Sequence, residues 1–374
     1  MTPAGKAAMN DVMIESQPHA ARLTIDTGAL AANYRLLAAR AAPAETAAVV
    51  KANAYGTGIE AAVPALLKAG CRTFFVAHLA EAARVRALSR EATVYALNGL
   101  PVGTAAKFAE MQIRPVIGSL AELAEWQAAG APCPAALHVD TGMNRLGFRP
   151  EELAGLDLTA GRIALVMTHF VSSETPDAPI NARQRAAFAA VRRAIPDLPF
   201  SMSNSSGFFH HERLPVEQFR AGYALYGGNP CPGSANPMQP VVRLEAPILQ
   251  IRRVPKGESV GYNQRWTARR DSIIATISLG YADGYPRNGA NTDDKPGGMA
   301  RIGGILCPFA GNVSMDLITV DVTDVPLGLV QRGAWIAVID EVLDVDRVGA
   351  SCGTIGYEIL TSLGDRFQRV TVGS

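Results

Sequence analysis

Short apolar runs alternate with stretches of helical spacing along the first two thirds of the chain. The earliest are a strand at 22–26 and a helix at 29–40. Later apolar runs predict strands at 46–51, 73–78, 93–97, 114–117, 135–140, 163–169, 199–203 and 217–222. Between most of them lie predicted helices, among them 59–68, 79–88, 120–129 and 182–194. Eight strands with intervening helices predict a closed parallel (β/α)8 barrel.

The pattern changes after about residue 243. Helical spacing fades, and β-rich runs bounded by glycine and proline follow at 246–254, 272–278, 300–306, 317–322 and 335–339. Such runs are typical of a mostly antiparallel domain. We therefore expect an α/β chain with an N-terminal (β/α)8 TIM-type barrel followed by a mostly β C-terminal domain. The expected segments are a flexible tail at 1–20, the barrel at 21–243 and the β-domain at 244–374.

Composition narrows the classes of protein that fit. A formal net charge of +1 argues against a nucleic-acid partner, which requires a basic surface. The five cysteines are scattered without a CxxC pair, which suits reduced thiols in the cytoplasm and offers no metal site. We find no signal peptide and no apolar run long enough to cross a membrane, so we expect a cytoplasmic protein without a membrane partner.

Lys51 ends the first predicted barrel strand, directly after Val49 and Val50. Burial at the mouth of a strand disfavours the ammonium form and lowers the lysine pKa, which an amine needs in order to attack a carbonyl. The alternative is a strand-end lysine that reaches for water. This segment alone leaves both interpretations open.

Polar side chains gather after the other predicted strands as well. The carboxyl ends of barrel strands, where barrel enzymes build their active sites, carry Lys51, Tyr55, Asp140, Thr141, Asn144, Arg145, His169, Asn204, Ser205, Ser206, Arg220, Gly222 and Tyr223. The segments SNSSG and RAGYALYGG follow strands seven and eight, the usual phosphate site of this architecture. They predict a phosphate-binding loop pair, although the glycines could instead serve only to close the barrel.

A phosphate site, an amine at a strand end and no cluster of metal ligands together point to pyridoxal 5'-phosphate, held as a Schiff base on Lys51. Arg220 cannot accept a hydrogen bond, so an arginine facing the pyridine nitrogen would leave that nitrogen unprotonated. The ring would then withdraw electrons weakly. This suits removal and return of a proton better than transamination.

Eight motifs resemble those of the alanine racemase family, fold type III of the pyridoxal phosphate enzymes. They are AVVKANAYGTG, HVDTGMNRLGF, MTHF, SNSSG, FRAGYALYG, SLGYADGYPR, GNVSMDLITVDVTD and GTIGYEIL, and they run in order through nearly the whole chain. The resemblance implies a pyridoxal phosphate-dependent homodimer that interconverts L-alanine and D-alanine. Its active site would lie between the barrel of one subunit and the β-domain of the other.

The resemblance also implies roles for individual residues. Lys51 would be the base acting on D-alanine, and Tyr281 of the partner subunit the base acting on L-alanine. Arg145 and the backbone near Met315 would hold the substrate carboxylate. Around the cofactor would lie Tyr55, Asn204, Ser205, Gly222, Tyr223 and Tyr357, with Arg220 at the pyridine nitrogen and His169 against the ring.

Inversion of a stereocentre through two bases requires one group on each face of the reacting carbon. A phenol with a pKa near ~10 needs help to act as a base at neutral pH. Cationic neighbours such as His169 and Arg220 would lower the Tyr281 pKa by stabilising the phenolate. Without that setting, Tyr281 would be only a wall of the pocket.

Three positions depart from the family pattern. His138 stands where many relatives carry a carbamate-modified lysine that braces the substrate-binding arginine, so either the bracing of Arg145 differs or a bound anion replaces it. Ser314 stands where cysteine is common, and Asn144 where glycine is common. These departures leave open a broader racemase acting on serine or other small amino acids.

Two other functions are compatible with parts of the sequence. A decarboxylase of the same architecture also carries a lysine in a VKAN-like strand, but it needs an acidic partner for the pyridine nitrogen. A non-catalytic pyridoxal phosphate carrier would be a single barrel, without the β-domain that holds Tyr281 and Met315.

Overall fold

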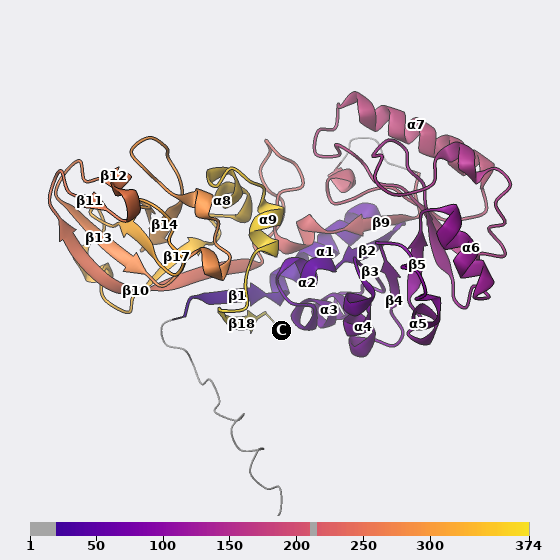
Figure 1. Cartoon of the computed structure of the whole chain (residues 1–374), viewed down its shortest axis with the longest axis horizontal. Helices are drawn as coiled ribbons and strands as arrows, with labels where there is room; N and C mark the ends of the chain where they lie inside the picture. The colour runs from indigo at the N-terminus through magenta and orange to yellow at the C-terminus, as the bar shows by residue number, and fades with distance from the viewer. Residues whose placement is uncertain (1–19, 210–214, 374) are drawn as a thin grey trace, which may run out of the picture.

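The computed structural model describes residues 20–209 and 215–373, which form a barrel and a β-rich domain placed end to end (Figure 1). The barrel is closed and parallel, and each of the eight predicted strands overlaps one of its strands. Its strands are β2 (Glu45–Val49), β3 (Thr73–Val76), β4 (Thr93–Ala96), β5 (Arg114–Ile117), β6 (Ala135–His138), β7 (Ile163–Met167), β8 (Phe200–Ser201) and β9 (Gln218–Ala221). The predicted barrel is therefore confirmed.

Helices surround the barrel. They are α1 (Thr27–Ala41), α2 (Lys51–Tyr55), α3 (Ile59–Lys68), α4 (Leu79–Leu88), α5 (Ala105–Glu110), α6 (Leu120–Ala128) and α7 (Pro179–Ala194). The Asp26 side chain caps the start of α1 by accepting from the Ala29 N–H, and Ser119 does the same for α6. Since the helices cover the strands from outside, both faces of the sheet are buried and the strands appear in the sequence as apolar runs.

The second domain is mostly β, as predicted. Its main sheet follows the order β15-β14-β17-β10-β1-β18, with β13 paired to β10 and β16 paired to β13. The strands are β10 (Val242–Val254), β11 (Ser259–Val260), β12 (Trp266–Thr267), β13 (Ser272–Ile277), β14 (Met299–Ile302), β15 (Ile305–Pro308), β16 (Ile318–Asp321), β17 (Trp335–Ile339) and β18 (Gln368–Val372).

Two details of the second domain differ from expectation. The predicted single run at 300–306 is a hairpin of β14 and β15, because Gly303 and Gly304 both adopt positive φ between them. Two helices, α8 (Val345–Ser351) and α9 (Gly356–Thr361), follow β17 in a region that we expected to be β-rich. Short 3₁₀ segments complete the chain: Pro150–Leu153, Ser206–Phe209, Tyr223–Tyr226, Tyr262–Gln264, Tyr281–Asp283, Arg287–Gly289 and Leu327–Leu329.

The first strand belongs to the second sheet. β1 (Arg22–Asp26) runs antiparallel to β10 and parallel to β18, so it pairs with two strands of the second domain. Residues 22–26 lie in space with the β-domain, although the predicted barrel segment 21–243 contains them. The boundary of the barrel domain at residue 21 therefore remains a prediction, and β1 itself is part of the second sheet. Apart from residue 20, the predicted tail lies outside the described residues.

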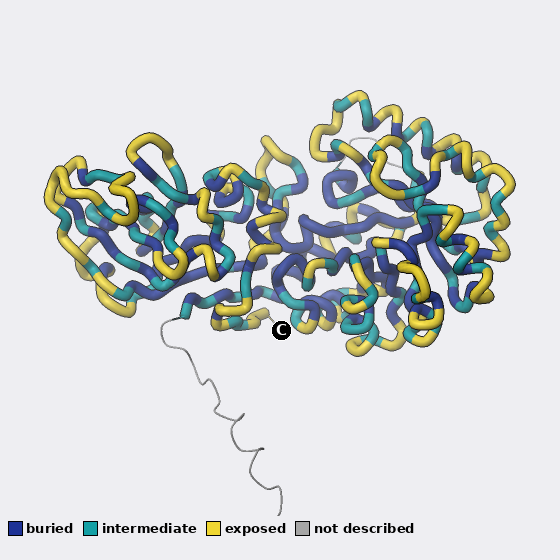
Figure 2. The backbone as a smooth tube through the Cα atoms, viewed as in Figure 1, coloured by how far each residue is buried: buried dark blue, intermediate teal, exposed yellow. Residues whose placement is uncertain are grey.

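The two domains share one apolar core, visible in Figure 2 as buried backbone that continues from the barrel strands into β1 and β10. α9 packs against α2, and a side chain at Gly56 would overlap the Leu360 carbonyl. Arg369 Nη1 also donates to the Gly56 carbonyl at 2.8 Å. The lysine-bearing end of β2 is thus held by the second domain. Across 20–209 and 215–373, no helix has the length and apolar character to cross a membrane.

The place of β1 is testable by truncating Leu23, a fully buried β1 side chain. Leu23→Ala should lower the free energy of unfolding by about 2–5 kcal/mol, because it leaves a cavity where β10, β1 and β18 meet. Leu36→Ala on the exposed side of α1 is the control and should cost no more than about 0.5 kcal/mol. Equal losses in chemical denaturation would contradict this placement.

Candidate active site

A cavity of about 880 Å³ lies at the carboxyl ends of the barrel strands. Ten of the predicted site residues line it: Lys51, Tyr55, Arg145, His169, Asn204, Ser205, Arg220, Gly222, Tyr223 and Tyr357. The structure therefore brings together most of the side chains that the sequence suggested. Tyr281 and Met315 are not among its lining residues.

Lys51 begins a left-handed helical turn. Ala52, Asn53, Ala54 and Tyr55 all have φ between 51° and 54°, although none is glycine. Such a backbone costs about 1–2 kcal/mol per residue and persists only where surrounding contacts support it. Two long side chains of α4 supply these contacts: Glu81 accepts from the Asn53 N–H at 3.2 Å, and Arg84 donates to the Asn53 side-chain oxygen at 2.7 Å. The turn carries Lys51 and Tyr55 into the same cavity.

Burial lowers the pKa of Lys51, and the nearby charges of Arg145 and Arg220 lower it further. Glu81 acts in the opposite direction but does not compensate. A larger fraction of the amine is therefore neutral at a given pH than for a lysine in water. Of the two interpretations of Lys51, the structure supports the nucleophilic amine.

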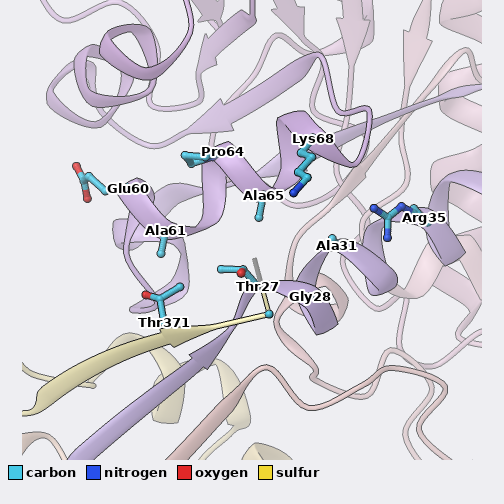
Figure 3. A pocket seen from close by; sticks show the side chains of 11 residues that line it. Thr27, Gly28, Ala31, Arg35, Glu60, Ala61, Pro64, Ala65, Lys68 and Thr371 are labelled. Carbon is cyan, nitrogen blue, oxygen red and sulfur yellow. The ribbon is translucent and has the colours of Figure 1, made fainter.

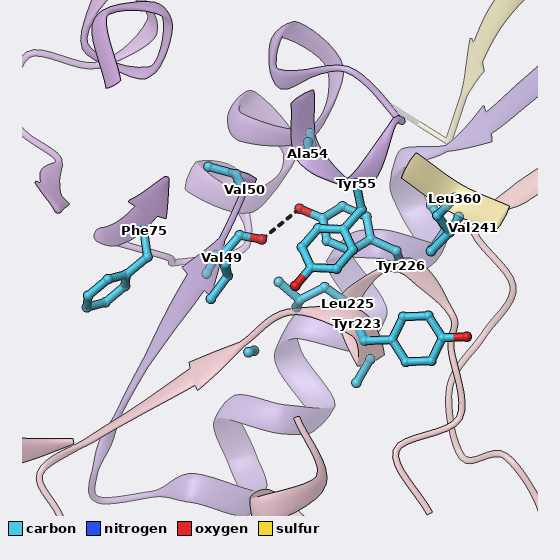
Figure 4. Close-up of a cluster of buried hydrophobic side chains, with 14 of the residues drawn as sticks. Val49, Val50, Ala54, Tyr55, Phe75, Tyr223, Leu225, Tyr226, Val241 and Leu360 are labelled. Carbon is cyan, nitrogen blue, oxygen red and sulfur yellow. Dashed lines mark hydrogen bonds between the residues drawn. The ribbon is translucent and has the colours of Figure 1, made fainter. Parts of the chain in front are cut away.

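Tyr55, Ser205 and Gly222 line one end of the cavity, which we call the phosphate end after the role expected for them. The Ser205 hydroxyl oxygen accepts from the N–H groups of Gly222 and Ala224, at 3.0 and 3.1 Å. A Cβ at Gly222 would stand 2.6 Å from the Tyr55 hydroxyl, so only glycine leaves room there. Tyr55 is fixed by stacking on Tyr226, with ring centroids 4.6 Å apart (Figure 4). Burial raises the pKa of Tyr55 and keeps its phenol a hydrogen-bond donor.

The floor of the cavity is a network around Arg220. This buried guanidinium donates to the Ser201 hydroxyl at 2.7 Å, to the Thr168 carbonyl at 2.6 Å and to His169 Nδ1 at 3.2 Å. Arginine can only donate, so Nδ1 of His169 is the acceptor and its proton resides on Nε2. Burial lowers the pKa of Arg220 to about 10, which leaves it protonated at neutral pH.

His169 is a neutral imidazole. Burial first, and then the charge of Arg220, hold its pKa well below the usual value. The expectation that His169 acts as a cation is therefore wrong, because a buried imidazole beside a guanidinium does not take up a proton at neutral pH. Its remaining polar atom is an Nε2–H donor.

The departures at positions 138 and 144 have physical explanations. Burial, together with Arg220, lowers the pKa of His138 to about 4, so His138 cannot brace Arg145 as a carbamate anion would. The two side chains line the same cavity. Asn144 has φ 55°, a left-handed conformation that both glycine and asparagine tolerate. Replacing the usual glycine therefore requires no change in backbone.

Tyr281 and Met315 meet on the second domain. The Tyr281 N–H donates to the Ser314 carbonyl, and the Ala282 N–H donates to the Met315 carbonyl. Arg366 ties this loop pair together through Asp283 at 3.2 Å and Asp316 at 2.8 Å. Tyr281 is 40% exposed and Met315 55% exposed. Ser314 accepts this hydrogen bond through its backbone carbonyl, so serine in place of cysteine does not affect the bond to Tyr281.

A second cavity, of about 570 Å³, lies between α1, α3 and β18 (Figure 3). Its charged groups are Arg35, Glu60 and Lys68, and Glu60 is already paired with Arg84. None of the residues expected at the active site lines this cavity. In the described part of the chain, no three His, Cys, Asp or Glu side chains come together as a metal site would require.

Comparison with known proteins decides the family. The model of the alanine racemase N-terminal domain matches residues 25–230, and that of the alanine racemase C-terminal domain matches residues 241–371. The chain belongs to the alanine racemase family. An alanine racemase of Methylobacterium nodulans is 55% identical over 365 residues, covering 96% of this chain and 97% of the relative. One from a second Methylobacterium strain is 54% identical, covering 96% of this chain and 100% of the relative.

Solved structures agree with this family. The alanine racemase of Bartonella henselae with covalently bound pyridoxal phosphate has a TM-score of 0.89 and 38% identity, covering 94% of this chain and 99% of the other. Family membership confirms the expected enzyme class, an isomerase, and the dependence on pyridoxal phosphate. It sets aside the decarboxylase and the single-barrel carrier, since both racemase domains are matched.

The cavity fits the cofactor of the alanine racemase family. A lysine with a lowered pKa lies within it, and the absence of a side chain at Gly222 leaves space beside the Tyr55 hydroxyl. Sequence reasoning missed other lining residues, among them Asn98, Ile355, Glu358 and Thr361. The last three lie in or beside α9, and a helix this short leaves little periodic signal.

The lowered pKa of Lys51 predicts how the cofactor-free protein captures pyridoxal phosphate. Covalent capture should persist at pH values at which a lysine in water is almost entirely protonated. Arg145→Gln removes one cause of the shift, so the Lys51 pKa should rise and the midpoint of the pH–rate curve should move upward. Arg149→Gln, an exposed arginine four residues further on, is the control and should leave the midpoint unchanged. A downward shift in Arg145→Gln would contradict this electrostatic account.

Proposed function

We propose that this chain interconverts L-alanine and D-alanine as a homodimer, with Lys51 and Tyr281 of the partner subunit acting on opposite faces of the substrate carbon. The observation that carries this proposal is the separation of the two side chains. Lys51 lies in the barrel cavity, whereas Tyr281 is exposed on the second domain and does not line the cavity of its own chain. A second copy can bring Tyr281 to the cavity without unfolding either domain.

Exposed apolar side chains support an interface between two copies. Ile355 is 62% exposed and Leu146 is 49% exposed, and both lie at the cavity. On the second domain, Met315 and Leu317 are exposed near Tyr281. Apolar groups concentrated around a functional site are typical of protein–protein contact surfaces. Their burial against a partner would also exclude water from the cavity.

When bound, pyridoxal phosphate supplies an aldehyde for the Lys51 amine and a ring that withdraws electrons from the substrate carbon. Tyr55, Ser205, Gly222 and Tyr357 bind its phosphate in this proposal, with Asn204 and Tyr223 beside them. Arg220, which lines the same cavity, would face the ring nitrogen. The guanidinium donates to Ser201, Thr168 and His169 and has no acceptor atom of its own. Unlike a carboxylate, it therefore does not stabilise a proton on the ring nitrogen.

Arg145 binds the substrate carboxylate. It lines the cavity and makes no ion pair with any residue of 20–209 or 215–373, so its guanidinium is available for an anionic ligand. The partner subunit's Met315 adds a backbone group from the other side. Held in this way, the hydrogen on the substrate carbon points to Lys51 in one enantiomer and to Tyr281 of the partner subunit in the other.

Tyr281 of the partner subunit acts as a base with the help of a hydrogen bond from the neutral His169 imidazole. His169 carries its proton on Nε2, because Nδ1 accepts from Arg220. An Nε2–H donated to the phenol oxygen favours the phenolate, since a hydrogen bond to the charged form of an acid lowers its pKa. Arg220 acts through His169, and Lys51 returns or removes the proton on the opposite face.

We further propose that the enzyme works in the cytoplasm and supplies D-alanine as a peptidoglycan precursor. Five free thiols, four of them buried, support a reducing compartment. A serine or small amino-acid racemase is the nearest alternative in substrate, and chiral analysis of the products with a panel of amino acids separates the two.

The shared site is tested by mixing two inactive variants, Lys51→Ala and Tyr281→Phe. After unfolding and refolding a 1:1 mixture, activity should return to about a quarter of the wild-type level, because half of the dimers are mixed and each holds one intact site. Each variant refolded alone is the control and should stay inactive. If both residues acted within one chain, no combination would restore an intact site, and the mixture would remain inactive.

Tyr281→Phe tests the assignment of faces. Because each direction of racemisation needs both bases, the variant should lose about 10²–10⁴-fold of kcat/KM in both directions. It should still exchange the Cα hydrogen of D-alanine with deuterium oxide, since Lys51 is intact, while L-alanine stays unlabelled. Proton NMR measures both exchanges. Labelling of L-alanine at the wild-type rate would sink the assignment.

A further inference from the structure

The phosphate end of the cavity is connected to a carboxylate that no part of the proposed reaction uses. Asp346, in the first turn of α8, accepts from the Tyr223 hydroxyl through Oδ1 at 2.7 Å. Its other oxygen, Oδ2, accepts from the Asn229 N–H, also at 2.7 Å. Both contacts reach from the second domain into the segment that follows β9. Asp346 therefore ties α8 to the barrel loop behind the cavity.

The Tyr223 side chain packs closely against two glycines, Gly228 and Gly356. A side chain at Gly228 would overlap the ring, and one at Gly356 would overlap its hydroxyl. Tyr223 is almost fully buried, and in Figure 4 its side chain extends away from the stacked pair of Tyr55 and Tyr226. Its phenol thus points to Asp346 rather than into the cavity. The family resemblance implies a place for Tyr223 around the cofactor, and in the structure the Tyr223 hydroxyl donates to Asp346.

Tyr223 in turn holds Tyr357. The two rings stack with centroids 3.9 Å apart and an angle of 11° between their planes. Tyr357 is partly exposed at the cavity, on α9, and its other ring neighbour is Tyr55 at 6.2 Å. Stacking on a ring that is itself fixed restricts the positions that the Tyr357 side chain can adopt. The orientation of Tyr357 therefore depends on the Tyr223–Asp346 hydrogen bond.

We propose that Asp346 is a positioning residue for phosphate binding, acting through Tyr223 on the Tyr357 hydroxyl at the cavity. It touches neither the phosphate nor the substrate. By fixing the Tyr223 phenol, it holds the Tyr357 ring in the orientation that receives the cofactor, so that less freedom is lost on binding. The inference rests on the proposed role of Tyr357 at the phosphate.

The test compares two ligands, pyridoxal phosphate and pyridoxal, which lacks the phosphate. Titration of the cofactor-free full chain, followed by protein fluorescence, gives each dissociation constant. Asp346→Ala and Tyr223→Phe should each raise the constant for pyridoxal phosphate about tenfold, as expected for loss of a hydrogen bond to a charged group. The constant for pyridoxal should change less than about twofold, since the affected group binds the phosphate. The double variant should be little weaker than Asp346→Ala, because both changes break the same bond.

Asp344→Ala is the matched control. Asp344 caps the same helix by accepting from the Arg347 N–H at 2.7 Å, so its loss weakens α8 without breaking the Tyr223 contact. It should lower thermal stability and leave the pyridoxal phosphate affinity unchanged. Equal weakening of both ligands by Tyr223→Phe, or no weakening of either, would overturn the positioning role. Tyr357→Phe tests the underlying assignment separately: if it leaves pyridoxal phosphate affinity unchanged, the proposed phosphate role of Tyr357 fails.

Discussion

The structure depends on a left-handed turn that is unfavourable for most of the residues that form it. Four consecutive residues after Lys51 have positive φ, and each lacks the freedom of glycine. The turn is held from two directions. Glu81 and Arg84 of α4 bind its Asn53, while α9 and Arg369 of the second domain close over Gly56. The lysine is thus presented to the cavity by a strained backbone that both domains must support.

Around this turn, charge is arranged to favour anions while lowering the pKa of the Lys51 amine. Lys51, Arg145 and Arg220 line one cavity, and His138 and His169 between them remain uncharged because of burial and the arginines. Each further positive charge would compete with the others in a medium of low dielectric constant. The neutral histidines relieve this conflict, since they provide hydrogen-bonding atoms without adding charge. The result suits a phosphate and a carboxylate bound side by side.

The sequence predicted the barrel well because its strands are buried on both faces and so appear as apolar runs, as in β3, where all four residues are buried. It also gathered the polar residues at the strand ends, since parallel strands share one edge. The sequence did not predict the conformation after Lys51. In Ala-Asn-Ala-Tyr only Asn53 readily tolerates a left-handed backbone, so tertiary contacts impose the geometry on the other three residues. α9 was missed because six residues are too few for a periodic pattern. The neutral state of His169 could not be predicted either, because it follows from burial in the folded chain, which no local sequence pattern reveals.

The second domain contributes two separate sets of groups. Through α8 and α9 it supports the phosphate end of the cavity in its own chain, by the stack of Tyr223 on Tyr357 and by the closure over Gly56. Through the Tyr281–Met315 loops it presents groups that its own cavity does not use. In the dimer that we propose, retention of the cofactor and inversion of the substrate would therefore depend on different surfaces of one domain. Since both surfaces belong to the same β-rich domain, the proposed contact between two copies would align each Tyr281 with a cavity that is formed within the other chain.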